Sequence, residues 1–458
     1  MAFFLISAFW QAYDAIIPLI LTNHFGLPQT ASGAVMSIDN VLAVFMLPIF
    51  GAISDRVNTK YGKRTPFIFF GTIVAVISFI CLTFIDNYQL ASVIGAGIPE
   101  IQQGTMTDEA FAELVRKTAV ELTIANPLPL IGFIATLLVT LIAMATFRSP
   151  AVALMPDVTV KPLRSKANAI INLTGTAGGI IVLALGMVFA TSKDHYMQYT
   201  PYVIAVTSVM VLGFIIFLFS VKEKKWAEEM EEESKRLGID EAPAKEISVS
   251  KAGKLSRGEF TSLLLILASV ALWYIGYNSI TSKYSVYATN ILGFDFNLTL
   301  IIAQAAAIVS YIPVGIISSK IGRRKTILAG VTILATAFFV GNFITSSTPE
   351  FVMFPVFILA GIGWASINVN SFPMVVELAK HGDVGKYTGY YYTASMSAQI
   401  VAPILSGMLY DLIGMRYVFF AFGTLFVAFS FVTMFFVKHG DSTPVEKKSV
   451  LENLDIDD

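Results

Sequence analysis

The ionisable side chains inside long apolar runs are the first candidates for chemistry. Asp14 follows FWQAY in the first run, and Asp39 precedes Asn40 in the second. A carboxylate in such a run is costly unless it faces a polar cavity. Burial and mutual repulsion would favour the protonated form of one of two neighbouring carboxylates. We therefore predict that Asp14 and Asp39 lie at similar depth on adjacent helices and bind a proton in a working cycle. The alternative is that each carboxylate only bonds a neighbouring hydroxyl or amide and holds the helices together.

Two cations also interrupt apolar runs. Arg148 stands alone before Pro150, and Lys283 lies near the end of its run. Arg148 is either the partner of a carboxylate or of a substrate hydroxyl, or an arginine that reaches out to the membrane interface. For Lys283 we expect the second behaviour, because long basic side chains near helix ends extend their charge into water.

Aromatic rings and amides recur at one-turn spacing in several runs, as in LWYIGYNSITSKY and GIGWASINVNSFP. Amides supply donor and acceptor pairs for hydroxyl groups and flat rings cover C–H surfaces, so this combination suits a sugar. The same side chains also serve as ordinary hydrogen-bonding contacts between membrane helices. The predicted substrate-binding set is Trp10, Gln11, Asn40, Arg148, Trp273, Tyr274, Tyr277, Asn278, Gln304, Trp364, Asn368, Asn370 and Gln399.

Other kinds of chemistry have little support. Cys81 is the single cysteine, which excludes an internal disulfide and most thiolate metal sites. The four histidines fall in predicted loops or the tail, and the net charge of −1 gives no basic field for nucleic acid. We predict a protein that is not an enzyme and that needs no metal and no cofactor.

The elements that carry these residues are predicted membrane helices. Hydrophobic residues form 55% of the chain and charged residues 14%, which is more apolar surface than one soluble core can hide. Runs of about 18–25 residues are long enough to cross a bilayer. They lie at approximately 3–21, 31–53, 66–85, 128–155, 165–190, 200–221, 260–289, 297–318, 326–345, 351–377, 387–411 and 417–437.

Lysine and arginine gather in alternate loops. The rich segments are 54–66, 157–166, 222–258, 319–326, 378–386 and 438–458. The other loops hold Arg116, Lys117, Lys193 and Arg416. Since basic loops stay in the cytoplasm, we predict a multi-pass protein of the cell membrane with both termini cytoplasmic.

The loop 222–258 divides the runs six and six. The predicted organisation is a bundle at 1–221, a linker at 222–258, a second bundle at 259–437 and a tail at 438–458. The outer loop 86–127 contains one amphipathic segment, with Phe111, Leu114, Val115 and Leu122 on one face. That segment is either a partial lid on the outer rim or a helix that only fills the loop.

A basic hairpin occurs twice. GAISDRVNTKYGKR begins at Gly51, and GIISSKIGRRK, a weaker copy, begins at Gly315. A repeat of this length indicates a duplicated membrane protein. We predict a gating role for Asp55, Arg56, Arg64, Arg323 and Arg324, through ion pairs that break when the two halves move. Positive charge that merely holds the loops inside is the alternative.

These hairpins resemble the signature loop of the major facilitator superfamily. SDRVNTKYGKRTPFI, SPAVALMPDVTVKPLRSKANAIINLTGTAGG and GYYYTASMSAQIVAPILSGMLYD further resemble the glycoside–pentoside–hexuronide:cation symporters and the sucrose:proton transporters. The resemblance implies an all-α fold of twelve transmembrane helices in two pseudo-symmetric six-helix bundles. It also implies that Asp55 and Arg56 belong to an inner gate, although the second copy has Ser319 where the first has its acid. Ala43 and Leu47 replace the paired aspartates of the sodium-using branch, which favours a proton over sodium.

The sequence as a whole predicts a proton-coupled sugar symporter that works by alternating access. Its expected partners are a small sugar, a proton and the lipid bilayer, and we expect a monomer. The alternative is an exporter of amphipathic small molecules with the same fold, which the 36 phenylalanines and 16 methionines would permit.

Overall fold

The computed structural model describes residues 1–98, 106–160, 163–236, 256–378 and 384–439. Twelve of its helices are long and apolar enough to cross a membrane, and they correspond in order to the twelve predicted runs. No strand occurs in the described residues. The predicted fold class is therefore confirmed.

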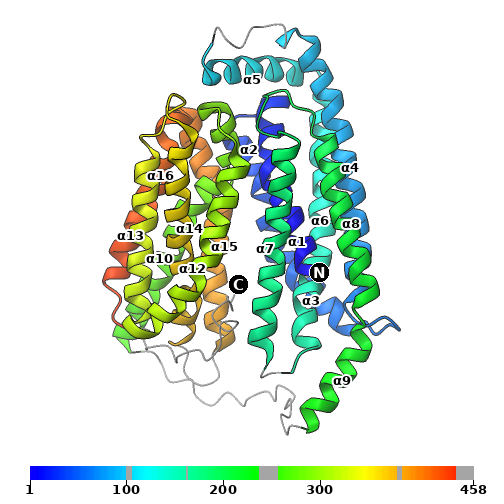
Figure 1. Ribbon diagram of the computed structural model, residues 1–458, viewed down its shortest axis with the longest axis vertical. Coiled ribbons are helices and arrows are strands. Elements are labelled where there is room, and N and C mark those ends of the chain that lie inside the picture. Colours follow the sequence, from blue (N-terminus) through cyan, green and yellow to red (C-terminus); the bar gives the residue numbers. More distant parts are fainter. Residues whose placement is uncertain (99–105, 161–162, 237–255, 379–383, 440–458) are drawn as a thin grey trace.

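Helices α1 to α8 form the N-terminal half, and α10 to α16 form the C-terminal half (Figure 1). The first half contains α1 (Ala2–Leu19), α2 (Gln29–Met36), α3 (Ile38–Arg56), α4 (Thr65–Gly95), α5 (Asp108–Ala125), α6 (Leu128–Asp157), α7 (Arg164–Val188) and α8 (Thr200–Ser220). The second contains α10 (Arg257–Thr281), α11 (Tyr284–Tyr287), α12 (Phe296–Ile321), α13 (Arg323–Gly341), α14 (Met353–Val376), α15 (Val384–Ile413) and α16 (Met415–Phe435).

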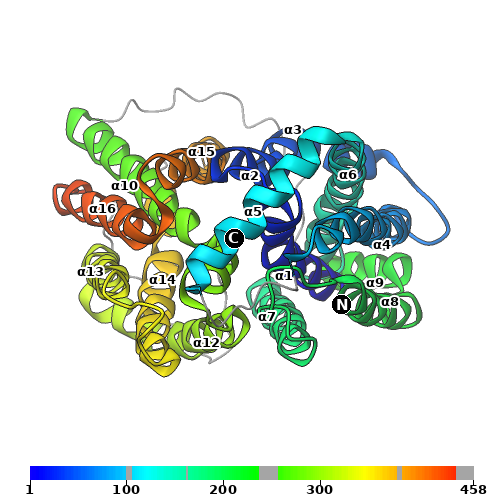
Figure 2. The same cartoon turned by 90° about the horizontal axis from the view of Figure 1, so that it is seen from above.

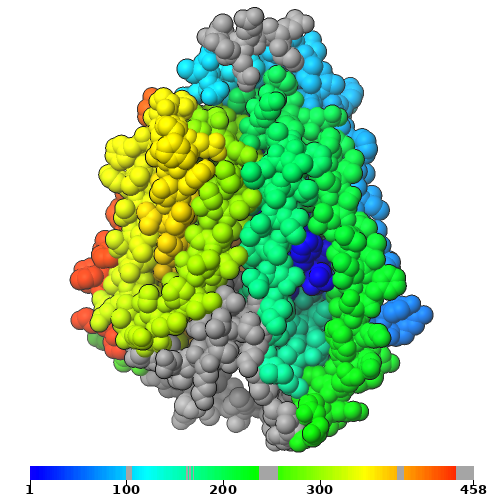
Figure 3. Space-filling view, in the orientation of Figure 1, coloured from blue at the N-terminus to red at the C-terminus, as the bar shows by residue number. Residues whose placement is uncertain are grey.

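The two halves lie side by side when seen from above, with α1, α2 and α7 of one half nearest to α12 and α15 of the other (Figure 2). The space-filling view shows α7 and α12 in contact along the upper part of the front face (Figure 3). Here "upper" is the end at which α5 lies in Figure 1, and "lower" is the end at which α9 (Glu223–Arg236) lies.

Corresponding helices of the two halves end alike at the upper side. α1 runs into the π-helical turn η1 (Ile20–His24), and α11 runs into the π-helical turn η5 (Ala288–Leu292). Both turns contain Thr-Asn and are followed by a glycine with positive φ, +70° at Gly26 and +69° at Gly293. Only glycine adopts that conformation without strain, so the pattern T-N-x-x-G is a second internal repeat. It supports the duplication that the hairpins indicate.

The predicted amphipathic segment of the outer loop forms α5, which crosses the upper end of the molecule (Figure 2). Its N-terminus is capped by the Thr107 side chain. Phe111 and Val115 pack with Val93 and Ile98, where α4 continues ten residues beyond the predicted end of its run. Because α5 contacts both η1 and η5, it lies over the seam between the halves.

The linker between the halves begins with α9, an exposed helix of mixed charge. Residues 237–255 of the predicted linker and 440–458 of the predicted tail lie outside the described residues, so the predicted domain boundaries stay predictions. Met1 lies part-way down the bundle (Figure 1).

Candidate functional site

A cavity of about 1310 Å³ lies between the two halves. Its walls come from α1, α3, α6 and α7 on one side and from α10, α12, α14 and α15 on the other. Typical ligand pockets have about 300–1,000 Å³, and the excess here reflects an opening. The lining reaches Pro156 and Arg164, where α6 ends and α7 begins, so the cavity opens at the lower end, beside the basic hairpins.

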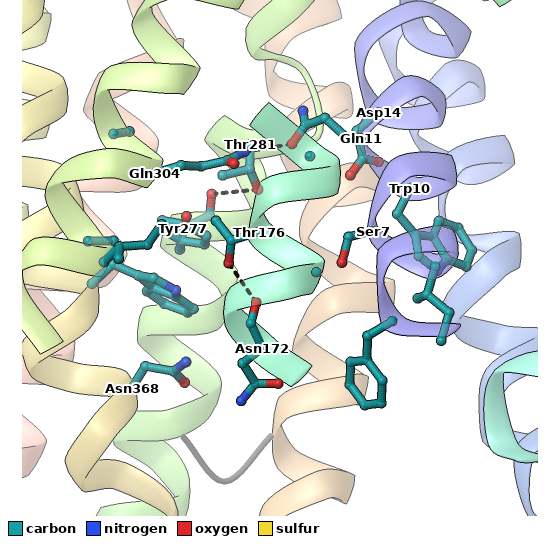
Figure 4. A pocket seen from close by; sticks show the side chains of 18 of the residues that line it. Ser7, Trp10, Gln11, Asp14, Asn172, Thr176, Tyr277, Thr281, Gln304 and Asn368 are labelled. Atoms are coloured by element: carbon teal, nitrogen blue, oxygen red, sulfur yellow. Dashed lines mark hydrogen bonds between the residues drawn. The ribbon is translucent and has the colours of Figure 1, made fainter. Parts of the chain in front are cut away.

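The two halves meet in the cavity through a pair of amides (Figure 4). Gln304 Nε2 donates to Gln11 Oε1 across 2.6 Å. Gly179 of α7 allows this approach, because a Cβ there would lie 3.3 Å from Gln304 Oε1 and 3.5 Å from Gln11 Oε1. The other polar atom of each amide can serve a bound molecule, so the pair offers Gln11 Nε2 as a donor and Gln304 Oε1 as an acceptor.

An aromatic stack forms the opposing wall. The rings of Tyr277 and Trp364 are 3.7 Å apart and nearly parallel, at 8°. Tyr274 meets Trp364 edge-on at 5.4 Å and holds it in position. Asn368 lies one turn below Trp364 and also lines the cavity. This wall presents a flat ring with an amide beside it, which is the arrangement predicted from the one-turn spacing.

Asp14 lines the cavity from the N-terminal half, and its side chain is exposed there. Trp10 lies one turn below it on α1 (Figure 4). The guanidinium of Arg148 lies 5.8 Å from the Trp10 ring centroid, within the range of a cation–π interaction. Arg148 therefore borders the cavity, where the first of its two predicted roles would place it, and that role stays a prediction.

Asp39 is not among the residues that line the cavity. Its carboxylate accepts a hydrogen bond from Asn40 Nδ2 at 2.9 Å. It is close enough to Asp14 and to Arg148 for their charges to interact. The predicted pair is thus electrostatically linked, while Asp14 alone borders the cavity.

Several predicted binding residues lie away from the cavity lining. They are Asn40, Trp273, Tyr274, Asn278, Asn370 and Gln399. Trp273 is fully buried, Asn278 donates to the carbonyl of Tyr274, and Asn370 bonds Ser318 and the carbonyl of Ser366. These contacts are internal to the C-terminal half. They are of the kind that the sequence analysis gave as the alternative, namely ordinary contacts between membrane helices. The one-turn spacing identified the correct helices but included their packed faces.

The cavity also contains polar residues that the sequence analysis did not identify. They are Ser7, Asn168, Asn172, Thr176, Thr281 and Ser285. Asn168, Asn172 and Thr176 follow one another at four-residue spacing in the run 165–190, a polar stripe that could have been recognised. Among the described residues, no three His, Cys, Asp or Glu side chains group as a metal site requires.

The upper ends of the halves are joined by hydrogen bonds, and we call this contact the upper seam. The Asp411 carboxylate of α15 accepts from the backbone N–H groups of Gln29 and Thr30, each at 2.7 Å, and from Thr30 Oγ1 at 2.6 Å. It therefore caps the first turn of α2 in the other half. Asn23 and Asn290 exchange two side-chain bonds, at 3.2 and 2.7 Å.

Lys283 corrects the expectation that it would reach the membrane interface. Its side chain is fully buried in the upper seam, and Nζ donates to Ser32 Oγ of α2 at 2.5 Å. No local pattern in the sequence indicates this burial, because it is the packing of α2 against the second half that covers the end of α10.

The first basic hairpin is tied into the lower end of its own half. Arg64 Nη2 bonds Asp55 at 2.5 Å and Nε bonds Asp157 at 2.7 Å. Burial opposes the charge of Arg64, but the bonds to Asp157 and Asp55 outweigh it and raise its pKa. The Glu223 carboxylate, at the start of α9, accepts the backbone N–H groups of residues 63, 64 and 65 at 2.6–2.9 Å.

The second hairpin has a corresponding ion pair despite its missing acid. Arg323 pairs with Glu377, which directly follows α14 as Asp157 ends α6. Arg324 bonds the backbone carbonyls of Met434 and Phe435. Glu377 is thus the counterpart of Asp157, whereas Ser319 leaves the second hairpin without a counterpart of Asp55, so the two hairpins match in part. Arg56, the remaining predicted gate residue, is exposed.

Comparisons with known proteins agree with this architecture. The family model described as Major Facilitator Superfamily matches residues 118–310 and 295–453, and the one described as MFS/sugar transport protein matches residues 1–97. The inward-open xylose transporter XylE from E. coli has 15% identity and a TM-score of 0.61, covering 99% of this chain and 97% of that chain.

Other similar structures carry different cargoes. The nucleoside transporter NupG has 14% identity and a TM-score of 0.52, covering 95% of this chain and 97% of that chain. A bacterial homologue of the iron transporter ferroportin has 13% identity and a TM-score of 0.61, covering 95% and 96%. At these identities the likeness is one of fold.

Proposed function

Because this chain belongs to the major facilitator superfamily and is a multi-pass membrane transporter, we propose that it is a proton-coupled symporter for a sugar such as a glycoside or a disaccharide. The observation that carries the proposal is the juxtaposition of Asp14 with the Tyr277–Trp364 stack and the Gln11–Gln304 pair on one cavity. A titratable acid and a sugar-like set of contacts therefore share one chamber between two halves.

In this proposal the sugar lies between the halves, with a C–H face on the Tyr277–Trp364 wall and hydroxyls on Gln11, Gln304 and Asn368. A proton on Asp14 removes the cost of a bare carboxylate beside the bound sugar. Asp39 and Arg148 adjust that cost through their charges. Movement of the halves then exposes the loaded cavity to the other side.

A proton is favoured over sodium because Ala43 and Leu47 of α3 offer no oxygen ligands. Within the proposal the lower end faces the cytoplasm, as the distribution of lysine and arginine indicates. The cavity is then open to the inside, the protein is monomeric in the cell membrane, and both termini are cytoplasmic. Labelling of single cysteines in the hairpins from either side of the membrane tests this orientation.

The basic hairpins are the proposed inner gate. Asp55, Arg56 and Arg64 act in the first half, and Arg323 and Arg324 act in the second. When the lower ends close, the ion pairs of Arg64 and Arg323 would have to rearrange. The ion pairs of Arg64 and Arg323 lie at matching places in the two halves. This supports the proposal, since equivalent contacts can break and form together while the halves rotate as rigid bodies.

Uptake of labelled sugars into proteoliposomes under an imposed pH gradient tests the function. Asp14→Asn is expected to abolish proton-driven accumulation while exchange of sugar at equal concentrations continues. Asp39→Asn is expected to weaken accumulation, and Glu232→Gln on the exposed face of α9 serves as the matched control. Accumulation that persists unchanged in Asp14→Asn would overturn the proposal.

An exporter of amphipathic molecules is the second candidate. Part of the lining favours it, because Phe3, Ile6, Phe338, Phe357 and Phe420 contribute apolar surface to the same cavity. Resistance of an expressing strain to a panel of amphipathic compounds, together with an absence of sugar-induced thermal stabilisation across mono- and disaccharides, would favour the exporter.

A further inference from the structure

The upper seam contains a buried amine that the proposed sugar and proton cycle does not use. We propose that Lys283 is a separate proton-binding site of the upper seam, neutral while the seam is closed and protonated from the outer solution when the halves separate there. This inference depends on movement of the halves, but it does not require that the cargo be a sugar or that Asp14 carry a proton.

The geometry shows why the closed seam disfavours a charge on this amine. Lys283 is 0% exposed, and its amine donates a hydrogen bond to Ser32 Oγ. A charged ammonium has three N–H donors, and in a buried setting each donor needs an acceptor. Ser32 is itself fully buried and belongs to α2 of the opposite half. Separation of α2 from the second half would therefore break this bond and expose the amine to water.

Asp411 of α15 acts on Lys283 through its charge, but the two are not within 4.0 Å as an ion pair, and the Asp411 carboxylate is engaged by α2. Arg116 of α5 also acts on Asp411 and is paired with Glu113.

Two further charged residues belong to the neighbouring helices α16 and α1. From α16, Arg416 donates to Tyr287 of α11. Asp14 of α1 meets this region through its backbone carbonyl, which accepts from Ser285 Oγ. A lysine that served only as a fixed cation would be expected beside a free carboxylate, whereas the Asp411 carboxylate that acts on Lys283 already caps α2.

The titration behaviour agrees with this geometry. Burial lowers the pKa of Lys283 to about 7, and the charge of Asp411 only partly opposes it. A hydrated lysine titrates near pH ~10.4. The open seam therefore binds the proton more tightly than the closed seam, so falling pH favours opening.

The expected size follows from the linkage of one proton. Between pH ~10 and pH ~7 the ratio of open to closed seams should rise about tenfold for each unit that the pH falls. Below pH ~7 the amine is protonated in both states and its contribution becomes constant. A measurement from pH 9 to pH 7 should thus show a rise of about 50-fold in this ratio, because the amine of the closed seam is half protonated at pH ~7.

Pulsed electron paramagnetic resonance on the full chain can measure that ratio. Spin labels at Ser92→Cys and Ser346→Cys, in a Cys81→Ser background, mark exposed upper positions of the two halves. The population of long distances in lipid nanodiscs, recorded without substrate at pH 9, 8 and 7, reports opening.

Lys283→Met should flatten the profile between pH 9 and pH 7 and keep the seam closed. Lys283→Arg, which stays charged, should hold the seam open at every pH. Lys117→Gln, which removes an exposed lysine of α5, should leave the profile unchanged. An unaltered pH profile in Lys283→Met, or a seam in Lys283→Arg that closes normally at pH 9, would overturn the inference. Either result leaves the sugar and proton proposal standing.

Discussion

The contact of Gly33 with α15 predicts that one methyl group can force the upper seam apart. A Cβ on Gly33 would lie 2.1 Å from the carbonyl oxygen of Pro403 and 2.7 Å from its carbonyl carbon. Both are backbone atoms, so no rotamer change can relieve the overlap. Gly33→Ala is therefore expected to destabilise the closed seam.

The magnitude follows from overpacking at rigid contacts, which typically costs about 1–3 kcal/mol. Alanine also improves the helix propensity of α2 by up to ~1 kcal/mol, but the closed and open seams share that gain. The strain is relieved when the halves separate at the top, so it appears in the equilibrium between the two states. A cost of about 1–3 kcal/mol shifts that ratio about 5- to 150-fold toward open.

The distance between spin labels at Ser92→Cys and Ser346→Cys measures this shift. Gly132→Ala in α6 is the matched control, because its new Cβ would find its nearest atom, Ile85 Cδ1, at 3.9 Å. A well-folded Gly33→Ala protein whose distance distribution equals that of the control would refute the reasoning. It would show that α2 and α15 can slide past each other without opening the seam.

Three further outcomes are expected. Glu223→Gln should speed hydrogen exchange of the amides at residues 63–65 about tenfold through the loss of about 1–2 kcal/mol of capping, whereas Glu229→Gln on the same helix should not, because Glu229 pairs with Lys225 of α9. Asn290→Ala should open the upper seam more than Asn23→Ala, since Asn290 also bonds His195 Nδ1 at 3.0 Å, and the label distances check this order. Burial lowers the pKa of His195, so the closed seam should weaken as the pH falls below ~6.5, and His195→Asn should remove that additional step in the same assay.

The twelve spans and the division into two halves could be predicted because each rests on a local property. The length of the apolar runs predicts the membrane spans. The alternation of basic loops predicts on which side of the membrane each loop lies. The amphipathic face of α5 was also local, with Phe111 and Val115 four residues apart. These features need no knowledge of which helices touch.

For the candidate site, the sequence indicated which helices contribute residues but not which faces of those helices line the cavity. One-turn spacing grouped Trp364 with Asn368 and Tyr277 with Trp273. The packing of the helices decides which of these side chains face the cavity, and Trp273 is buried inside its own half instead. The burial of Lys283 depends on α2 of the other half, a contact that spans 251 positions in the sequence. Such pairings between distant segments carry no local signal.

The mutual bonds of Asn23 and Asn290 have one further consequence. The two residues occupy the same place in the repeated pattern T-N-x-x-G, and each bonds the other. A residue that meets its own counterpart lies on a two-fold axis, as in the isologous interface of a homodimer. The pseudo-dyad of the molecule therefore passes between these two amides, and a six-helix ancestor bearing this asparagine could have paired with a second copy of itself before the two were joined in one chain.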